Sequence, residues 1–242
     1  VNRSALNERL TALGKYAPGF APPIVAKTYK VAVVRIDFSD KSMTKTQAQS
    51  EAQFANVRTF FSENSYGLMS LDFTVTSVYR MSRAHSFYAN GINSQYSFMA
   101  NEALALASNA GFSLTGFDHV MIYHAGDGAE TTSNANIWSA YLSTALVSGP
   151  TIGAKVFPGT TFVPETEGQS VDPLGVVCHE YGHQLGLPDQ YNTASNSAPG
   201  VGKWSLMDSG IYIGSPLGSN PSHLDAWSKL FLGFNAPQNI SF

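Results

Sequence analysis

Apolar runs along the chain predict strands and helices in mixed order. Residues 28–40, TYKVAVVRIDFSD, form a near-continuous apolar run that is typical of a central strand. Apolar and polar positions alternate over 71–81 as in a half-buried strand, and residues 117–128 predict a third strand that runs into a glycine turn. Apolar side chains recur at helical spacing over 46–62 and 94–110, so we expect helices there.

The second half of the chain has a less regular pattern. Residues 128–168 are rich in Ser, Thr, Gly and Pro, and we expect loops there with an edge strand around 154–163, near a binding cleft. A helix is predicted over 172–185, an irregular glycine-rich stretch over 186–219 and a last helix over 221–232. The pattern therefore predicts an α/β fold: a twisted mixed sheet with helices, followed by a smaller irregular C-terminal part.

The composition narrows the class of protein. The 242 residues are 43% hydrophobic and only 13% charged, against about 25% charged in a typical soluble domain, and the formal net charge is −3. The 14 Lys and Arg residues form no run, which argues against nucleic acid or anionic lipid as a partner. No apolar run approaches the ~20 residues that span a bilayer, so we expect no membrane span.

Uncharged polar residues carry most of the remaining polarity. Ser, Thr, Asn and Gln are abundant beside 21 Gly, which is typical of exported microbial proteins; a low-charge cytosolic domain is the alternative. Cys178 is the single cysteine, so no internal disulfide can form. The chain begins at Val1 without a basic and apolar leader, so we expect that a signal peptide was removed or was never present.

One segment, HEYGHQLGLPD, concentrates the candidate chemistry. On a helix, His179 and His183 are four residues apart, so both imidazoles project from one face and can share a metal ion. Glu180 lies beside them, where its carboxylate can reach a water on that ion. Gly186 favours the end of the helix, and the following turn lets Asp189 swing back as a third ligand.

The same helix carries an apolar stripe, formed by Leu174, Cys178, Tyr181 and Leu185. This stripe can pack on a sheet while the histidines face the metal. Cys178 lies about 100° around the helix from its neighbour His179, which favours a buried thiol over a metal ligand. Two other interpretations of the motif remain: histidines that only satisfy buried hydrogen bonds, and a zinc site without catalysis.

The segment HEYGHQLGLPDQY resembles the zinc motif of the immune inhibitor A-type secreted bacterial metallopeptidases, which are metzincin-like enzymes with an acidic third ligand. Further similar stretches follow in the order of that family: KVAVVRIDFSD, FFSENSYGLMSLDFTV, HVMIYHAGDG, IWSAY, GKWSLMDSG and PSHLDAWSKLFLGF. The resemblance covers roughly residues 29–234. It implies a metzincin-like fold with backing and active-site helices, a zinc ion on His179, His183 and Asp189, and secretion.

The resemblance also implies roles for residues around the motif. Met207 would be the methionine of the turn beneath the metal, and a plain core methionine is the alternative. Tyr212 is a candidate stabiliser of the tetrahedral oxyanion, and Tyr191 is a second one; each could equally be a pocket-wall aromatic. Ser205 stands where relatives often carry an acidic residue, which puts an orienting role at that position in doubt.

Other polar residues give weaker signals. Relatives often bind calcium, and several aspartates could supply oxygen ligands, although their spacing favours no particular site: Asp37, Asp40, Asp127, Asp172 and Asp208. The histidines outside the motif lack partners at ligand spacing, and we expect structural roles for His85, His119, His124 and His223.

These inferences predict a secreted zinc endopeptidase that acts on proteins or peptides as a monomer, with substrate paired to the edge strand at 154–163. We expect an extension or pro-segment remnant at 1–28 and two catalytic subdomains, 29–185 and 186–242, with the cleft between them. Two alternatives remain. One is a peptidase-like module that binds protein or glycan without cleaving it, and the other is a zinc peptidase restricted to glycosylated proteins.

Overall fold

The computed structural model of the protein describes residues 26–89, 93–132, 135–143, 151–152, 155–168, 170–193 and 200–235. Most of the expected extension at 1–28 lies outside these ranges.

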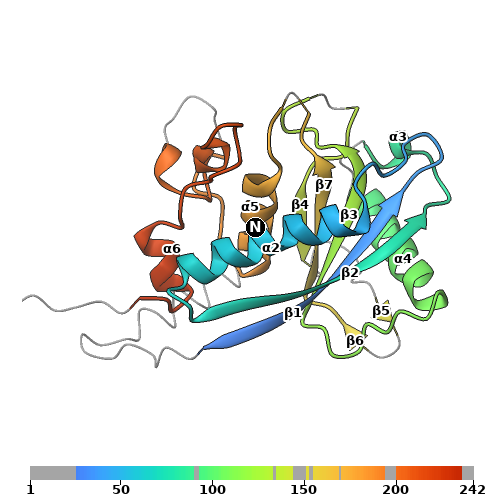
Figure 1. Ribbon diagram of the computed structural model, residues 1–242, viewed down its shortest axis with the longest axis horizontal. Coiled ribbons are helices and arrows are strands. Elements are labelled where there is room, and N and C mark those ends of the chain that lie inside the picture. The colour runs from blue at the N-terminus through green and yellow to red at the C-terminus, as the bar shows by residue number, and fades with distance from the viewer. Residues whose placement is uncertain are drawn as a thin grey trace, which may run out of the picture.

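A five-stranded mixed sheet forms the middle layer (Figure 1). The strands, in spatial order, are β2 (Met69–Arg80), β1 (Lys27–Asp37), β3 (His119–Asp127), β7 (Gly159–Thr166) and β4 (Ala140–Ser143). The first four run parallel, whereas β4 pairs antiparallel with β7 at the edge. The central strand predicted at 28–40 is therefore confirmed as β1, and its continuous apolar run follows from burial on both faces.

Helices cover both faces of this sheet. On one face, α2 (Gln47–Asn64) and α5 (Leu174–Gln184) pack on Val31, Val33 and other alternate residues of the strands. On the other face, α4 (Asn93–Asn109) and the short α3 (His85–Tyr88) enclose a second core with Ala32 and Val34. The three layers confirm the predicted α/β fold class, including the helices predicted over 46–62, 94–110 and 172–185.

The prediction of an edge strand at 154–163 is wrong. Residues 159–166 form the inner strand β7, between β3 and β4, while β5 (Thr151–Ile152) and β6 (Lys155–Val156) make a separate two-stranded sheet. Within the described part of the chain, β4 is the edge strand that contacts α5. Long-range parallel pairing with β3 buries β7, and a short apolar stretch among Gly, Thr and Pro does not reveal that pairing.

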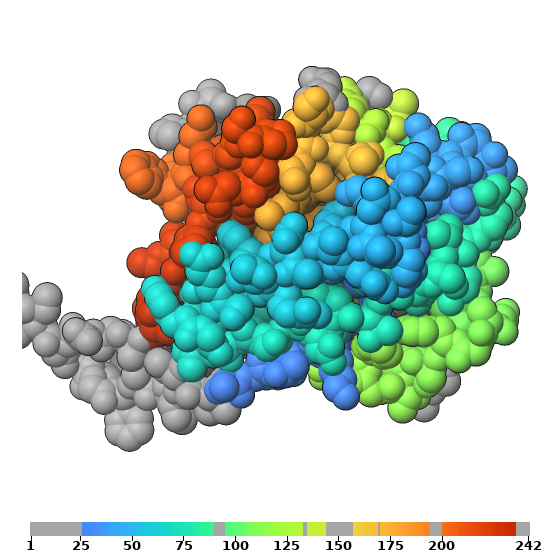
Figure 2. Space-filling model, viewed as in Figure 1, coloured from blue at the N-terminus to red at the C-terminus, as the bar shows by residue number. Residues whose placement is uncertain are grey.

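The C-terminal part contains little regular structure, as predicted. After α5 the chain forms two 3₁₀ turns, η1 (Gly202–Trp204) and η2 (Ser209–Tyr212), and then α6 (Ala226–Phe231). The last helix begins later than predicted because the Asp225 carboxylate accepts hydrogen bonds from the backbone N–H groups of Trp227 and Ser228. This part lies beside the end of α2, where Leu224 N donates to Asn64 Oδ1 over 2.8 Å (Figure 2).

Among the residues that the structure describes, no helix combines the length and the apolar character needed to cross a bilayer.

Candidate metal centre

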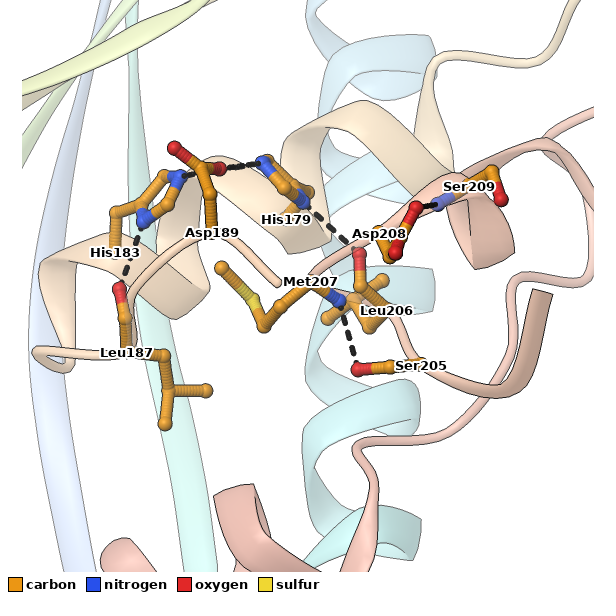
Figure 3. Close-up of polar contacts among 9 residues, drawn as sticks. All are labelled: His179, His183, Leu187, Asp189, Ser205, Leu206, Met207, Asp208 and Ser209. Atoms are coloured by element: carbon orange, nitrogen blue, oxygen red, sulfur yellow. Dashed lines mark hydrogen bonds and ion pairs between the residues drawn. The ribbon is translucent and has the colours of Figure 1, made fainter. Parts of the chain in front are cut away.

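Helix α5 positions the two motif histidines and ends where the sequence predicts. Gly186 has φ +97°, a left-handed conformation that glycine adopts without strain, and the N–H of Leu187 bonds back to Gly182 O over 3.1 Å. The chain then turns toward the helix and brings Asp189 beside the histidines (Figure 3). The predicted apolar stripe is buried in the core around α2, and Cys178 is a buried free thiol.

Backbone carbonyls orient both imidazoles. His179 Nδ1 lies 2.9 Å from Leu206 O, and His183 Nδ1 lies 2.8 Å from Leu187 O (Figure 3). Because a carbonyl oxygen only accepts, each Nδ1 must carry the proton and donate. In the neutral imidazoles, both Nε2 atoms are then unprotonated and free to bind a metal.

Three acceptor atoms meet at the tip of this arrangement. The two Nε2 atoms are 3.1 Å apart, and Asp189 Oδ1 lies 3.3 Å from that of His179 and 3.0 Å from that of His183. Two ligands of a tetrahedral metal with bonds of about 2.0–2.1 Å are about 3.3 Å apart, so the triangle has the size of one face of such a site. Lone pairs this close repel one another unless a cation lies among them, and the residues therefore fit a metal ion.

Charge at this point favours the ionised carboxylate. Burial raises the pKa of Asp189, but the adjacent imidazoles of His179 and His183 outweigh burial and hold the pKa of this carboxyl well below its usual range. Asp189 is thus available as an anionic ligand.

Glu180 lies next to the triangle. Its carboxylate and the two histidine nitrogens lie within 4.8 Å of one another, and the backbone of Tyr141 in β4 hydrogen-bonds it. Burial raises the pKa of Glu180 to about 8, and the charges of Glu130 and Asp189 add to the rise.

Met207 packs beneath the histidines (Figure 3). It is fully buried, and a β-carbon added at Gly182 would come within 2.6 Å of its sulfur. Only glycine at that position lets the thioether approach the helix between the two histidines. The geometry fits the proposed turn methionine, which contacts the ligand helix as an apolar floor.

The two candidate tyrosines occupy different surroundings. Tyr191 is 47% exposed, its ring lies 6.4 Å from that of His179 at an interplanar angle of 19°, and its hydroxyl hydrogen-bonds Asp189. Tyr212 is half-buried in η2, where burial, with the charges of Glu130, Glu167 and Glu180, raises its pKa to about 12. Tyr191 therefore contacts a metal-ligand candidate, whereas Tyr212 interacts electrostatically with the carboxylates of Glu130, Glu167 and Glu180.

Two glutamates near this site, the half-buried Glu130 and the fully buried Glu167, were not predicted. A β-carbon added at Gly128 would lie 2.4 Å from Glu130 Oε2 and 2.6 Å from Glu167 Oε1, so these oxygens converge on one space; neither has a hydrogen-bond partner. Burial and the neighbouring charge of Glu130 raise the pKa of Glu167 to about 8. The two residues are 37 positions apart in loops, so no local spacing could have shown the pair.

Glu167→Gln is therefore expected to stabilise the metal-free protein increasingly as the pH rises. The folded state holds this proton up to about pH 8 while the unfolded chain loses it near 4.5, so stability falls with rising pH across that window. The amide cannot ionise, and melting temperatures should be similar at pH 5 but higher for the variant by several degrees at pH 9; about 2–4 °C corresponds to 1 kcal/mol at this size. The melting temperature should depend on pH in the exposed control Glu51→Gln as it does in the wild type. The same pH dependence in Glu167→Gln would contradict this prediction.

The aspartates considered for calcium serve other contacts. Asp37 pairs with Arg80 at 2.6 Å, and the others bond nearby groups: Asp40 accepts from His85 N, Asp127 from Thr166 Oγ1, Asp172 from Leu174 N, and Asp208 from Gly202 N and Ser209 N. None of the five belongs to a group of three metal-binding side chains in the described part of the chain.

The remaining histidines contact residues other than those of the triangle. His119 Nδ1 lies 2.8 Å from Tyr181 Oη, and its ring stacks on Tyr29. His124 is fully buried, with its ring 6.3 Å from that of His85. His223 lies near the surface, 3.4 Å from Glu63.

The three-layer fold and the histidine–carboxylate triangle define the chain as a domain of the metallopeptidase class, and comparisons with known proteins agree. A family model described as the immune inhibitor A peptidase M6 catalytic domain matches residues 113–239, just over half of the chain. The chain belongs to this family.

Two relatives carry corresponding names. The pre-pro-metalloprotease PrtV of Vibrio cholerae is 28% identical over 232 residues, which cover 81% of this chain and 25% of that protein. Immune inhibitor A of Bacillus thuringiensis is 35% identical over 133 residues, which cover 47% of this chain and 18% of that protein. The chain thus spans a quarter or less of these relatives.

Solved structures support the fold. OgpA of Akkermansia muciniphila superposes with a TM-score of 0.54 at 16% identity, over 86% of this chain and 63% of that one. A catalytically inactive form of OgpA, in complex with an O-glycopeptide substrate, gives a TM-score of 0.53 at 15% identity over the same shares. At this identity the likeness concerns the fold alone.

Proposed function

We propose that this chain is a zinc-dependent endopeptidase domain that holds the ion with His179, His183 and Asp189. The observation that carries the proposal is the triangle of two unprotonated imidazole nitrogens and one carboxylate oxygen, 3.0–3.3 Å apart with no donor among them. Two imidazoles and one carboxylate form a ligand set that zinc hydrolases use, and it leaves a fourth position for water or substrate. A bound zinc ion would make a coordinated water acidic and would polarise the scissile carbonyl.

Glu180 then serves as the general base. It stands within 4.8 Å of the ligand nitrogens and is held by the Tyr141 backbone, so it can accept a proton from a water at the fourth position and later return it to the leaving amine. Tyr212 remains our candidate for hydrogen-bonding the oxyanion, while the bond between Tyr191 and Asp189 favours a ligand-orienting role for Tyr191.

Substrate would align along β4. This strand is the sheet edge beside α5, and its residue Tyr141 already bonds Glu180, so a peptide added to the free edge passes the base. Backbone pairing holds an extended peptide without demanding a fixed sequence, which fits an endopeptidase acting on proteins. The cleft would run between subdomains 29–185 and 186–242, whose division stays part of this proposal together with secretion and a monomeric state.

Metal analysis combined with a degradation assay tests this function. We expect about one zinc per chain, hydrolysis of casein, loss of hydrolysis with a strong chelator and recovery with added zinc. The same assay should include an O-glycosylated protein and its deglycosylated form, because OgpA binds an O-glycopeptide. Cleavage of the glycosylated form alone would favour the restricted peptidase, and zinc binding without turnover of any substrate would favour the non-catalytic module.

A further inference from the structure

The peptide group between Leu206 and Met207 is held from both ends. Its carbonyl accepts the Nδ1–H of His179 over 2.9 Å, and its N–H donates to Ser205 Oγ over 3.1 Å. Leu206, Met207 and Ser205 are all fully buried, so water does not compete for these bonds. The partner of the imidazole is thus a peptide whose own orientation depends on the Ser205 hydroxyl.

The hydroxyl is oriented in turn by a carboxylate. Ser205 Oγ donates to Asp225 Oδ2 over 2.9 Å, which leaves its lone pair for the N–H of Met207. Ser228 Oγ donates to the same Asp225 oxygen over 2.6 Å. Burial opposes ionisation of Asp225, but the hydrogen bonds of Ser228, Gln190 and Ser205 hold its pKa below its usual range, so the carboxylate is anionic at neutral pH.

Asp225 stands on a rigid support. Its other oxygen caps α6 through the N–H groups of Trp227 and Ser228, and α6 is anchored in the main core by Phe231. The segment that carries the third ligand is tied to the same cap, since Gln190 N donates to Met207 O over 2.8 Å and its side chain donates to Ser228 Oγ over 3.2 Å.

All these bonds point the same way. From His179 through the Leu206–Met207 peptide and Ser205 to Asp225, each donor gives its hydrogen to the next group, and the chain ends on a negative charge. Aligned hydrogen bonds polarise one another, so the carboxylate makes Leu206 O a stronger acceptor and His179 Nε2 more electron-rich. The hydrogen-bond partner of a metal-bound histidine sets its orientation and its basicity.

We propose that Asp225 is a positioning residue that acts through Ser205 and the Leu206–Met207 peptide to orient and strengthen His179 as a metal ligand. Ser205 has no charge of its own but connects the peptide to the carboxylate of Asp225, which lies 20 positions later in the sequence. His183 has a different kind of partner, since Leu187 O belongs to the turn that directly follows α5.

The test is a double-mutant cycle on zinc affinity, measured by competition with a calibrated chelator on protein shown to be folded. Ser205→Ala interrupts the series of hydrogen bonds but leaves the cap of α6 intact. This variant therefore tests the proposal even if Asp225→Asn weakens folding. We expect each variant to bind zinc about 10–100-fold more weakly. The double variant should bind zinc no more weakly than the single variant with the larger loss, because both changes interrupt the same series of hydrogen bonds.

Ser222→Ala is the matched control, since its hydroxyl donates to Lys203 O in the same C-terminal part but lies outside the chain. It should bind zinc as the wild type does. Unchanged affinity in folded Ser205→Ala, or losses that multiply in the double variant, would overturn the proposal. The inference rests on the proposed function, yet the two fail differently: wild-type protein that binds no zinc removes both, whereas normal binding in every variant removes only the role of Asp225.

Discussion

Glu180→Gln is expected to lower kcat for casein hydrolysis by about 10²–10⁴-fold while the chain still binds one zinc ion. The amide has the shape of the carboxylate but cannot take a proton from water. The triangle of His179, His183 and Asp189 is unchanged in this variant, so we expect the metal to stay in place. Steady-state kinetics and metal analysis on the same preparation provide the measurement.

Glu51→Gln, an exposed change on α2, is the control and should leave both quantities unchanged. Near-normal hydrolysis by Glu180→Gln would eliminate Glu180 as the base. Loss of zinc from this variant would instead assign Glu180 to the ligand set, and the acid–base role would need another residue.

Asp189→Ala should weaken zinc binding by more than the roughly 10–100-fold typical of losing a group that only orients a ligand. Removal of the carboxylate leaves two imidazoles and takes away the single anionic ligand of the triangle. Activity measured without excess zinc should fall in parallel. Chelator competition and metal analysis after dialysis check the result.

Tyr191→Phe is the matched comparison, because it removes only the hydroxyl that bonds Asp189. We expect this variant to lose no more than that roughly 10–100-fold in zinc affinity. Equal zinc retention by Asp189→Ala and Tyr191→Phe would show that another group supplies the third ligand.

Most of the candidate site can be predicted from the local spacing of residues. His179, Glu180 and His183 lie within two turns of one helix, and helical geometry alone puts them together. Gly186 and the turn after it are equally local, which is why Asp189 could be anticipated. The resemblance to a known family supplied Met207, and the structure packs it against Gly182 beneath the histidines.

Contacts between segments that are far apart in the sequence could not be predicted from local spacing. The edge-strand prediction for 154–163 is wrong because the place of β7 depends on its pairing with β3, about 40 residues away. Glu130 and Glu167 meet only after the loops that follow β3 and β7 fold together. Likewise, the sequence between Ser205 and Asp225 does not indicate that their side chains form a hydrogen bond.

The sequence by itself determined the elements with strong periodicity, the fold class and the metal-binding helix, because these follow from contacts between residues a few positions apart. Only the tertiary structure decided which strand forms the free edge, which carbonyl orients each histidine and which carboxylate supports the Met207 turn. Those choices depend on which distant segments share a core, and a one-dimensional pattern records the apolar character of each segment but not its partner.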